Sequence, residues 1–462
     1  MYYTRDTIAA ISTAMGGALN IIRISGMQAI EIVNNITKKD ITEQKSHTTK
    51  INYILDRSRE EIDEVMITVF HAPKSFTTEN VVEITTHGSP YIAQKILTLL
   101  VESGARIAEK GEFTLRAFWN GRFDLTQAEA IADLISAQNA SMHRIAWQQM
   151  KGGLSQKMKA LRQDLIHFTA LMELELDFAE EEVEFANRTQ FIHILKNTIS
   201  FIEGLLHSFR YGNALKKGVP VVIIGKPNAG KSTLLNALLE EEKAIVSPIP
   251  GTTRDVIEDT LTIEEITFRF MDTAGLRTTQ DIVEQLGVKR TLEKIQEAEI
   301  IIYVCSANPR GSEYEEDIYQ AYQNIQVYQK DKKNAQWIIL ANKADLYPRN
   351  EVQSFSNVPV LFVSAKEKQG ISALKVLLLN IVRQFLPDFQ TDLILTNQRH
   401  FDLLFKTQIH LKNALELFHQ SVSTELISID IKHALHYLGQ ITGDISTEDI
   451  LADIFTNFCI GK

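Results

Sequence analysis

The first 120 residues place apolar and polar side chains in short alternating segments that turn-forming residues separate. Alternation with a period of two puts the apolar side chains on one face of a strand, so this pattern predicts a sheet. From Ile92 to Val101 the apolar residues recur at three- and four-residue spacing, which predicts a helix. We therefore expect a mixed α/β domain over residues 1–120, with strands at Thr7–Ser12, Asn20–Ile24, Val65–Phe70 and Val81–Thr85.

From residue 121 onward the apolar positions follow a helical period. A second helix is expected over Phe191–Phe209, and the stretch Arg210–Gly218, which carries glycines and lysines, is interpreted as a linker. Helical periodicity returns after Pro387, and the final residues up to Lys462 are expected to be exposed. The long helix expected before Phe191–Phe209 is predicted by one continuous apolar stripe, made of Leu154, Met158, Leu161, Leu165, Phe168 and Met172.

The two helical regions flank a segment, residues 215–382, in which strand and helix patterns alternate. Helical faces need a partner to bury them, so we expect residues 121–214 and residues 383–462 to pack together as one discontinuous helical domain. The α/β segment is then an insertion into that domain. The predicted fold class is multidomain, α/β plus all-α.

The amino-acid composition and net charge exclude or disfavour several classes of protein. The chain has 462 residues, is 44% hydrophobic and contains 2 cysteines, which favours a multidomain protein of a reducing compartment. No apolar run approaches the length of about 20 residues that a membrane span needs, and no secretory signal is evident, so we expect a cytoplasmic protein. The net charge of −10 argues against a broad electrostatic grip on nucleic acid.

The strongest chemical signal is the stretch from Gly225 to Thr233, which follows the apolar run Val221–Ile224 and precedes a helical pattern. This is the phosphate-binding P-loop pattern G-x-x-x-x-G-K-S in strand–loop–helix context. Lys231 is expected to reach the β- and γ-phosphates, and Ser232 to offer its hydroxyl to Mg²⁺. The nucleotide-binding residues predicted here are Asn228, Ala229, Gly230, Lys231, Ser232 and Thr233.

Further motifs follow in the order expected of a GTPase. A carboxylate at Asp345 can accept two hydrogen bonds from the guanine N1–H and 2-amino group, which adenine does not offer as a pair. Each motif alone is often only a turn, but the set predicts a GTP-binding protein. The members are Gly251-Thr252-Thr253-Arg254-Asp255, Asp272-Thr273-Ala274-Gly275, Asn342-Lys343-Ala344-Asp345 and Ser364-Ala365-Lys366.

The residue after Gly275 bears on mechanism. Ras-like GTPases place a glutamine there to orient the attacking water, whereas this chain has Leu276. Asp281 and Glu284 are candidates for that role. From the residues alone, a solvated helix start is the favoured interpretation of these acidic side chains.

Several stretches together make the chain resemble the tRNA modification GTPases of the MnmE (TrmE) type along essentially its whole length. They are far more specific than a P-loop. These stretches are Ile21–Gly26, Ser75–Glu83, Gly111–Thr114, Gln127–Ile135, Ile249–Asp255 and Phe458–Lys462.

The resemblance implies an N-terminal folate-binding and dimerisation domain, a discontinuous helical domain and an inserted G domain. It further implies a homodimer that works with an FAD-containing partner, MnmG (also called GidA). Together they add an aminomethyl-type group (carboxymethylaminomethyl) to C5 of the wobble uridine of certain tRNAs. The carbon comes from a tetrahydrofolate derivative, in the 5-formyl or methylene form.

The resemblance also implies a folate site. The family residues that contact the folate correspond to Arg23, Glu83, Arg122 and Lys462, where Arg122 replaces the usual lysine. The segment Ser12–Asn20 is shorter and has fewer glycines than the family pattern.

In the G domain the resemblance implies a potassium ion that supplies the charge of an arginine finger. Asn228, Ser247, Ile249 and Thr252 would be its ligands, and Thr253 would join Ser232 on Mg²⁺. The resemblance also makes Glu284 the residue that positions the attacking water, beside Lys231 as the other catalytic residue, against the interpretation from the residues alone. The loop expected to surround GTP is Ser247, Pro248, Ile249, Pro250, Gly251, Thr252 and Thr253.

Two other function classes remain open at this point. One is a ribosome-assembly type GTPase switch, against which the acidic charge balance counts. The other is a folate-binding scaffold with an inactive G domain, against which the full set of G motifs counts.

Overall fold

The structure of the chain is a computed structural model that describes residues 6–137, 139–177, 188–240, 259–264, 266–271, 292–306, 313–329, 335–346, 353–384, 393–420, 424–456, 458 and 461. It contains two compact units. The first comprises Met1–Ser136, Ala146–Ser200 and Asp402–Lys462, and the second comprises Ala137–Ile145 and Phe201–Phe401.

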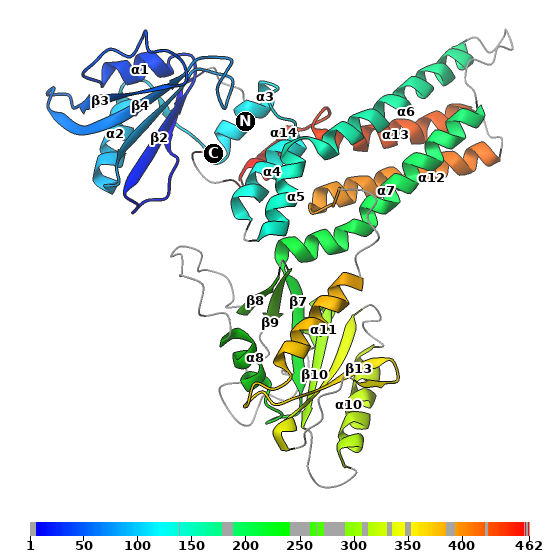
Figure 1. The fold of residues 1–462 in the computed structure, drawn as a ribbon. Coiled ribbons are helices and arrows are strands. Elements are labelled where there is room, and N and C mark those ends of the chain that lie inside the picture. Colours follow the sequence, from blue (N-terminus) through cyan, green and yellow to red (C-terminus); the bar gives the residue numbers. More distant parts are fainter. Residues whose placement is uncertain are drawn as a thin grey trace. The chain divides into compact units, whose positions relative to one another are not determined.

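The first unit begins with a six-stranded sheet in the order β3-β4-β5-β2-β1-β6 (Figure 1). Neighbouring strands are antiparallel except β1 and β6, which run parallel. The strands are β1 (Ile8–Ile11), β2 (Leu19–Ser25), β3 (Thr48–Leu55), β4 (Glu61–Phe70), β5 (Val81–His87) and β6 (Arg106–Ile107).

Helices α1 (Ala29–Asn35) and α2 (Pro90–Glu102) pack on one face of this sheet, where they share a core with Ile22, Ile67 and Ile84. Because side chains alternate along a strand, the residues between these point to the other face. That second face carries Arg23 opposite Glu83 in the β2–β5 register, next to α3 (Glu112–Trp119).

The helices that follow form a bundle. α6 packs against α13, and ring contacts join Phe168 to Phe191 at 5.0 Å and Phe191 to Phe418 at 5.1 Å. The predicted stripe is confirmed, since Leu154, Met158, Leu165, Phe168 and Met172 are buried. The elements are α4 (Leu125–Ser136), α5 (Ala140–Met150), α6 (Gly153–Asp177), α7 (Arg188–Lys217), α12 (Gln398–His419), α13 (Thr424–Thr442) and α14 (Glu448–Thr456).

The predicted linker Arg210–Gly218 is wrong, because helix α7 continues to Lys217. Gly212 does not interrupt helix α7 but allows another segment to pack closely against it. A β-carbon at this position would lie 2.1 Å from the carbonyl oxygen of Leu395, so the glycine lets the segment before α12 cross the helix. Leu395 is fixed there by a hydrogen bond from its amide to the hydroxyl of Ser208, 3.0 Å away.

The second unit is built on a seven-stranded sheet in the order β12-β13-β11-β10-β7-β9-β8 (Figure 1). The five central strands are parallel, while β8 and β12 are antiparallel edges. The strands are β7 (Val219–Gly225), β8 (Asp259–Ile263), β9 (Ile266–Met271), β10 (Ile300–Ser306), β11 (Gln336–Asn342), β12 (Gln353–Phe355) and β13 (Val358–Val363).

Apolar side chains cover both faces of this sheet. Ile300, Ile302 and Val304 of β10 belong to one core, and Ile301 and Tyr303 belong to the other. A parallel sheet buried on both sides leaves its ligand site at the carboxyl ends of the strands. The helices are α8 (Lys231–Glu240), α10 (Glu313–Gln329) and α11 (Ile371–Gln384). The expected combination of α/β and helical regions is thus confirmed.

None of the helices that the structure describes has both the length and the apolar composition that a bilayer crossing requires.

Candidate functional site

The loop between β7 and α8 has the backbone that a phosphate cradle needs. Gly225 has φ of 147° and Gly230 has φ of 93°, in the region that side chains disfavour. A β-carbon at Gly225 would lie 2.1 Å from the carbonyl oxygen of Val304, and one at Gly230 would lie 2.1 Å from Nδ2 of Asn342. Both positions therefore require glycine for space as well as for conformation.

Lys231 opens helix α8 and folds back over this loop. Its Nζ donates hydrogen bonds to the carbonyl oxygens of Gly225 and Lys226, each at 2.9 Å. Burial lowers the pKa of the Lys231 ammonium. The cation is held at the rim of the loop by neutral carbonyls, which an anionic phosphate can replace. Ser232 and Thr233 follow at the exposed start of the helix.

Asn342, at the end of β11, joins three of the predicted motifs. Its Nδ2 donates to the carbonyl of Ala229 at 2.8 Å, and its Oδ1 accepts from the amide of Ala365 at 3.0 Å. The hydroxyl of Ser364 donates to Oδ1 of Asp345 at 2.6 Å. The loop between β7 and α8 is therefore joined to the loops after β11 and β13 by hydrogen bonds, of which the two made by Asn342 are buried.

The remaining predicted residues of these loops take different environments. Lys343 has φ of 70°, Ala344 is buried, and the side chain of Lys366 is 82% exposed. Asn228 is exposed in the phosphate loop with φ of 59°. Its side chain is therefore open to a ligand.

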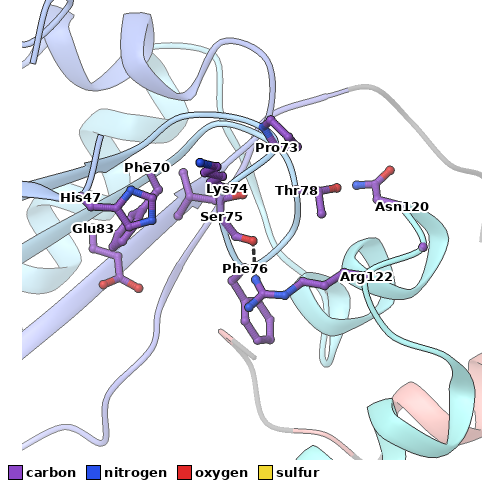
Figure 2. A pocket seen from close by; sticks show the side chains of 12 residues that line it. His47, Phe70, Pro73, Lys74, Ser75, Phe76, Thr78, Glu83, Asn120 and Arg122 are labelled. Carbon is purple, nitrogen blue, oxygen red and sulfur yellow. Dashed lines mark hydrogen bonds between the residues drawn. The ribbon is translucent and has the colours of Figure 1, made fainter. Parts of the chain in front are cut away.

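A second candidate site is a cavity of about 620 Å³ in the first unit, beside the open face of the N-terminal sheet (Figure 2). It lies between the ends of β4 and β5, the segment before β5 and the turn after α3. Its walls are His47, Phe70, Pro73, Lys74, Ser75, Phe76, Thr78, Val81, Glu83, Asn120, Gly121 and Arg122.

Arg23 and Glu83 form an ion pair across β2 and β5. Nε and Nη2 of Arg23 lie 2.9 and 2.8 Å from Oε1 of Glu83. The Arg23 guanidinium also lies 5.4 Å from the ring centre of Phe76 and 5.7 Å from that of Phe113. Because both nitrogens use one carboxylate oxygen, Oε2 of Glu83 takes no part in this pair.

Arg122 also contacts the Phe76 ring. Its Nη1 donates a hydrogen bond to the carbonyl of Ser75, as Figure 2 shows, and its guanidinium lies 5.3 Å from the Phe76 ring and 5.0 Å from the Phe123 ring. Burial lowers the pKa of Arg122. Its contacts in the described part of the chain include no carboxylate, so this exposed cation is suited to an anionic ligand.

Two family models match the chain. Residues 7–122 match the model described as the GTP-binding protein TrmE N-terminus, and residues 125–459 match the MnmE helical domain. A protein from Cytophaga hutchinsonii described as tRNA modification GTPase MnmE is 48% identical over 460 residues, covering 99% of this chain and 98% of the relative. One of the same description from Flavobacterium johnsoniae is 47% identical over 471 residues, covering 99% of each.

The chain belongs to the MnmE family of tRNA modification GTPases. The resemblance drawn from the sequence motifs is thereby confirmed. Among solved structures, the FeoB G-domain from Methanococcus jannaschii matches 36% of this chain and 98% of that chain at 22% identity, with a TM-score of 0.25. A similarity at that level adds nothing to the assignment.

Several site residues predicted from the GTPase motifs or from the MnmE resemblance lie outside the described residues. They are the GTP and ion ligands Ser247, Pro248, Ile249, Pro250, Gly251, Thr252 and Thr253, the motif Asp272, Thr273, Ala274 and Gly275, the catalytic candidate Glu284, and Lys462.

The expectation of an exposed C-terminus is wrong at Gly461, which is buried in this MnmE-family chain. Its carbonyl accepts hydrogen bonds from Nη1 of Arg23 at 3.2 Å and from the hydroxyl of Ser12 at 3.1 Å. With φ of 88° and a β-carbon position 2.8 Å from the carbonyl oxygen of Ile11, the position requires glycine. The segment Ser12–Asn20 contributes no residue to the cavity wall.

Sequence reasoning missed most of the MnmE cavity wall. Phe76 lies inside a stretch that the resemblance identified, but nothing local distinguishes a wall ring from a core ring. His47, Phe70 and Asn120 carry no motif at all. They reach the cavity only because β4 and the turn after α3 converge there.

Proposed function

We propose that this chain is the GTP-hydrolysing, folate-binding subunit of a complex that modifies the wobble uridine of certain tRNAs. In the complex it works with an FAD-containing partner of the MnmG type, and the product carries a carboxymethylaminomethyl group on C5. The observation that carries this proposal is the hydrogen bonding of Asn342, which ties a P-loop to a guanine-reading loop in a chain of this family.

The proposed domains follow the expectations from sequence. Residues 1–120 form the folate-binding and dimerisation domain, residues 121–214 and 383–462 the helical domain, and residues 215–382 the G domain. The packing of α6 on α13 supports the union of the two helical parts.

The described part of the cavity fits a tetrahydrofolate, in its 5-formyl or methylene form. The second oxygen of the Glu83 carboxylate is suited to the N3–H and 2-amino donors of a pterin. Arg122, which has no carboxylate partner among the described residues, suits the negative glutamate end, and the Phe76 ring, which both arginines contact, suits an aromatic group. Lys462 would add a second cation. When bound, the folate supplies the one-carbon unit.

In the G domain, Ser232 and Thr253 would hold Mg²⁺, and Asn228, Ser247, Ile249 and Thr252 would hold K⁺. The exposed hydroxyl of Ser232 at a helix start and the exposed amide of Asn228 in the phosphate loop support this assignment. Lys231 would neutralise phosphate charge. Glu284 would position the attacking water, because Leu276 has no group that can do so.

The proposed assembly is a cytoplasmic homodimer that meets tRNA mainly through the complex. An open sheet face that carries the half-exposed side chains of Ile51 and Met66 supports association through the N-terminal domain.

The deciding experiment compares GTP hydrolysis by the purified chain in KCl and in NaCl at equal ionic strength. We expect strong stimulation by potassium alone, and a Glu284→Ala variant that binds GTP normally but hydrolyses it about a hundredfold more slowly. Equal rates in the two salts would exclude the potassium site. Unchanged turnover in Glu284→Ala would remove the water-positioning role.

A further inference from the structure

Arg116 joins two sequence stretches that the family resemblance picked out, Gly111–Thr114 and Ser75–Glu83. It lies on α3 with its side chain only 1% exposed. Its Nη2 donates to Oδ1 of Asp6 at 2.7 Å and to Oε1 of Glu112 at 3.0 Å. Its Nη1 donates to the Asp6 carbonyl at 2.7 Å and lies 3.3 Å from both carboxylate oxygens of Glu79.

Charge balance accounts for the burial of this guanidinium. Burial alone would lower the pKa of Arg116, but the charge of Glu79 and the hydrogen bonds of Glu112 and Asp6 more than offset this effect and raise it. A planar guanidinium can meet several carboxylates at once, which an ammonium cannot. Arg116 is thus a fixed point between the sheet, α3 and the segment before β5.

Glu79 connects Arg116 to the segment that forms part of the cavity wall. Its Oε2 accepts a hydrogen bond from the hydroxyl of Ser25 at 2.7 Å, and that hydroxyl lies 2.6 Å from Oγ1 of Thr77. The Glu79 carbonyl accepts from the hydroxyl of Ser75, and its amide donates to Oγ1 of Thr77 at 3.3 Å. The segment Ser75–Glu79 is therefore held at several points by hydrogen bonds to Ser25 and within the segment itself.

The same segment forms the ligand-facing wall. The Ser75 carbonyl accepts a hydrogen bond from Nη1 of Arg122 (Figure 2), and the guanidiniums of Arg23 and Arg122 both contact the Phe76 ring. The Thr77 carbonyl accepts a hydrogen bond from Nδ2 of Asn120 at 2.7 Å. Thr78 has φ of 63°, a left-handed conformation that a threonine adopts only when its surroundings impose it.

We propose that Arg116 is a positioning residue of the cavity, which through Glu79 fixes the segment Ser75–Thr78 and with it the Phe76 ring and the Ser75 carbonyl. Ligand affinity then depends on a guanidinium that does not line the cavity. The part of this proposal that concerns ligand affinity rests on the proposed folate function, whereas the part that concerns the order of the segment does not.

Arg106 provides a matched control. It bonds the same two carboxylates, with Nε 2.6 Å from Oδ2 of Asp6 and Nη2 2.6 Å from Oε1 of Glu112. Among the described residues it makes no bond to Ser75–Glu79. An Arg106→Gln change weakens the network without loosening the wall, so it separates positioning from general stability.

The test uses the full-length chain and two readouts, hydrogen–deuterium exchange of the peptide around residues 74–80 and calorimetric affinity for 5-formyltetrahydrofolate. We expect Arg116→Lys to speed exchange in that peptide about tenfold and to weaken folate binding about tenfold, with GTP hydrolysis unchanged. Arg106→Gln should leave both readouts within about twofold.

A third variant covers the case in which Arg116→Lys does not fold. Ser25→Ala removes only the hydroxyl that links Glu79 to Thr77, and it should speed exchange in the same peptide about threefold. Equal effects of the Arg116 and Arg106 changes, or no change in peptide exchange with Arg116→Lys and Ser25→Ala, would overturn the positioning role. Absence of folate binding by the unaltered chain would instead refute the proposed folate function, and the exchange readout would still decide the role of Arg116.

Discussion

Asn342 and Ala229 are joined by a hydrogen bond of 2.8 Å, from the side-chain amide of the first to the main-chain carbonyl of the second. The residues are 113 positions apart in the chain. The bond joins the loop after β11 to the loop between β7 and α8, which we propose meet the base and the phosphates of GTP.

Replacing Asn342 with alanine should therefore weaken GTP and GDP binding together. The change leaves the Ala229 carbonyl and the Ala365 amide without their partner, at a cost of about 1–3 kcal/mol for each buried group. We expect at least a tenfold loss of affinity for both nucleotides, about 1.4 kcal/mol. Fluorescent-nucleotide titration measures it, and a loss confined to one nucleotide would contradict the rigid coupling.

Asp345→Asn should reduce the preference for guanine over adenine nucleotides. The carboxylate of Asp345 accepts from Ser364, and an amide in its place presents donors to the donor edge of guanine. We expect a loss of selectivity of about a hundredfold or more. Glu367→Gln is the control, because this carboxylate is 51% exposed and its one ion pair with a described residue is that with Lys366 at 3.6 Å. Competition of ATP against labelled GTP distinguishes the two variants.

Gly230→Ala should abolish nucleotide binding, since its β-carbon would occupy space 2.1 Å from Nδ2 of Asn342. The matched control is Gly121→Ala. Gly121 also has positive φ, at 74°, but nothing lies within 4 Å of its β-carbon position. The control should cost only about 1 kcal/mol of backbone strain and leave GTP binding intact. Equal nucleotide affinity of the two variants would show that crowding at Gly230 is unimportant.

The ion pairs of Glu112 should make the N-terminal domain sensitive to acid. Burial alone would raise the pKa of this carboxyl, but hydrogen bonds from Arg106, the Glu109 amide and Arg116 lower it below its ordinary value of 4.5. A carboxyl whose pKa is lowered by folding contributes stability that is full above its unfolded value. That stability is lost as the pH falls below 4.5 and through the folded pKa.

Glu112→Gln should accordingly destabilise the domain by about 1–3 kcal/mol at pH 7, and the difference from the unaltered chain should shrink below pH 4.5. Hydrogen exchange of the peptide around α3, corrected for intrinsic rates, measures it at each pH. A difference that stays constant between pH 7 and pH 4 would show that the ionised carboxylate contributes nothing.

The strand, glycine loop and helix around the proposed phosphate site were predictable because their signal lies in consecutive residues. The spacing of Gly225, Gly230 and Lys231 alone predicts a P-loop. The strand before this loop is apolar on both faces, which predicts a buried strand. The bond between Asn342 and Ala229 was not predictable, because it depends on β11 and β7 lying on either side of β10.

The helical and N-terminal regions show where local patterns fail. Gly212 resembles a helix breaker in sequence, yet it serves the close passage of Leu395, which only the tertiary structure reveals. The strand β3 escaped prediction because its first half, Thr48-Thr49-Lys50, is polar and lies at the sheet edge. The proposed role of Arg116 could not be predicted from the sequence, because its partners Asp6, Glu79 and Glu112 come from three separate segments.

The contact between Arg23 and Gly461 spans 438 positions of the chain. A ribosome that adds about 5–20 residues per second needs roughly 20 to 90 seconds to cover that distance. Strand β2 and its ion pair with Glu83 are therefore complete long before Gly461 exists. The hydrogen bonds of Arg23 and Ser12 with Gly461 can form only after nearly all of the described residues have been made, so a nascent N-terminal domain has its fold well before it has these contacts.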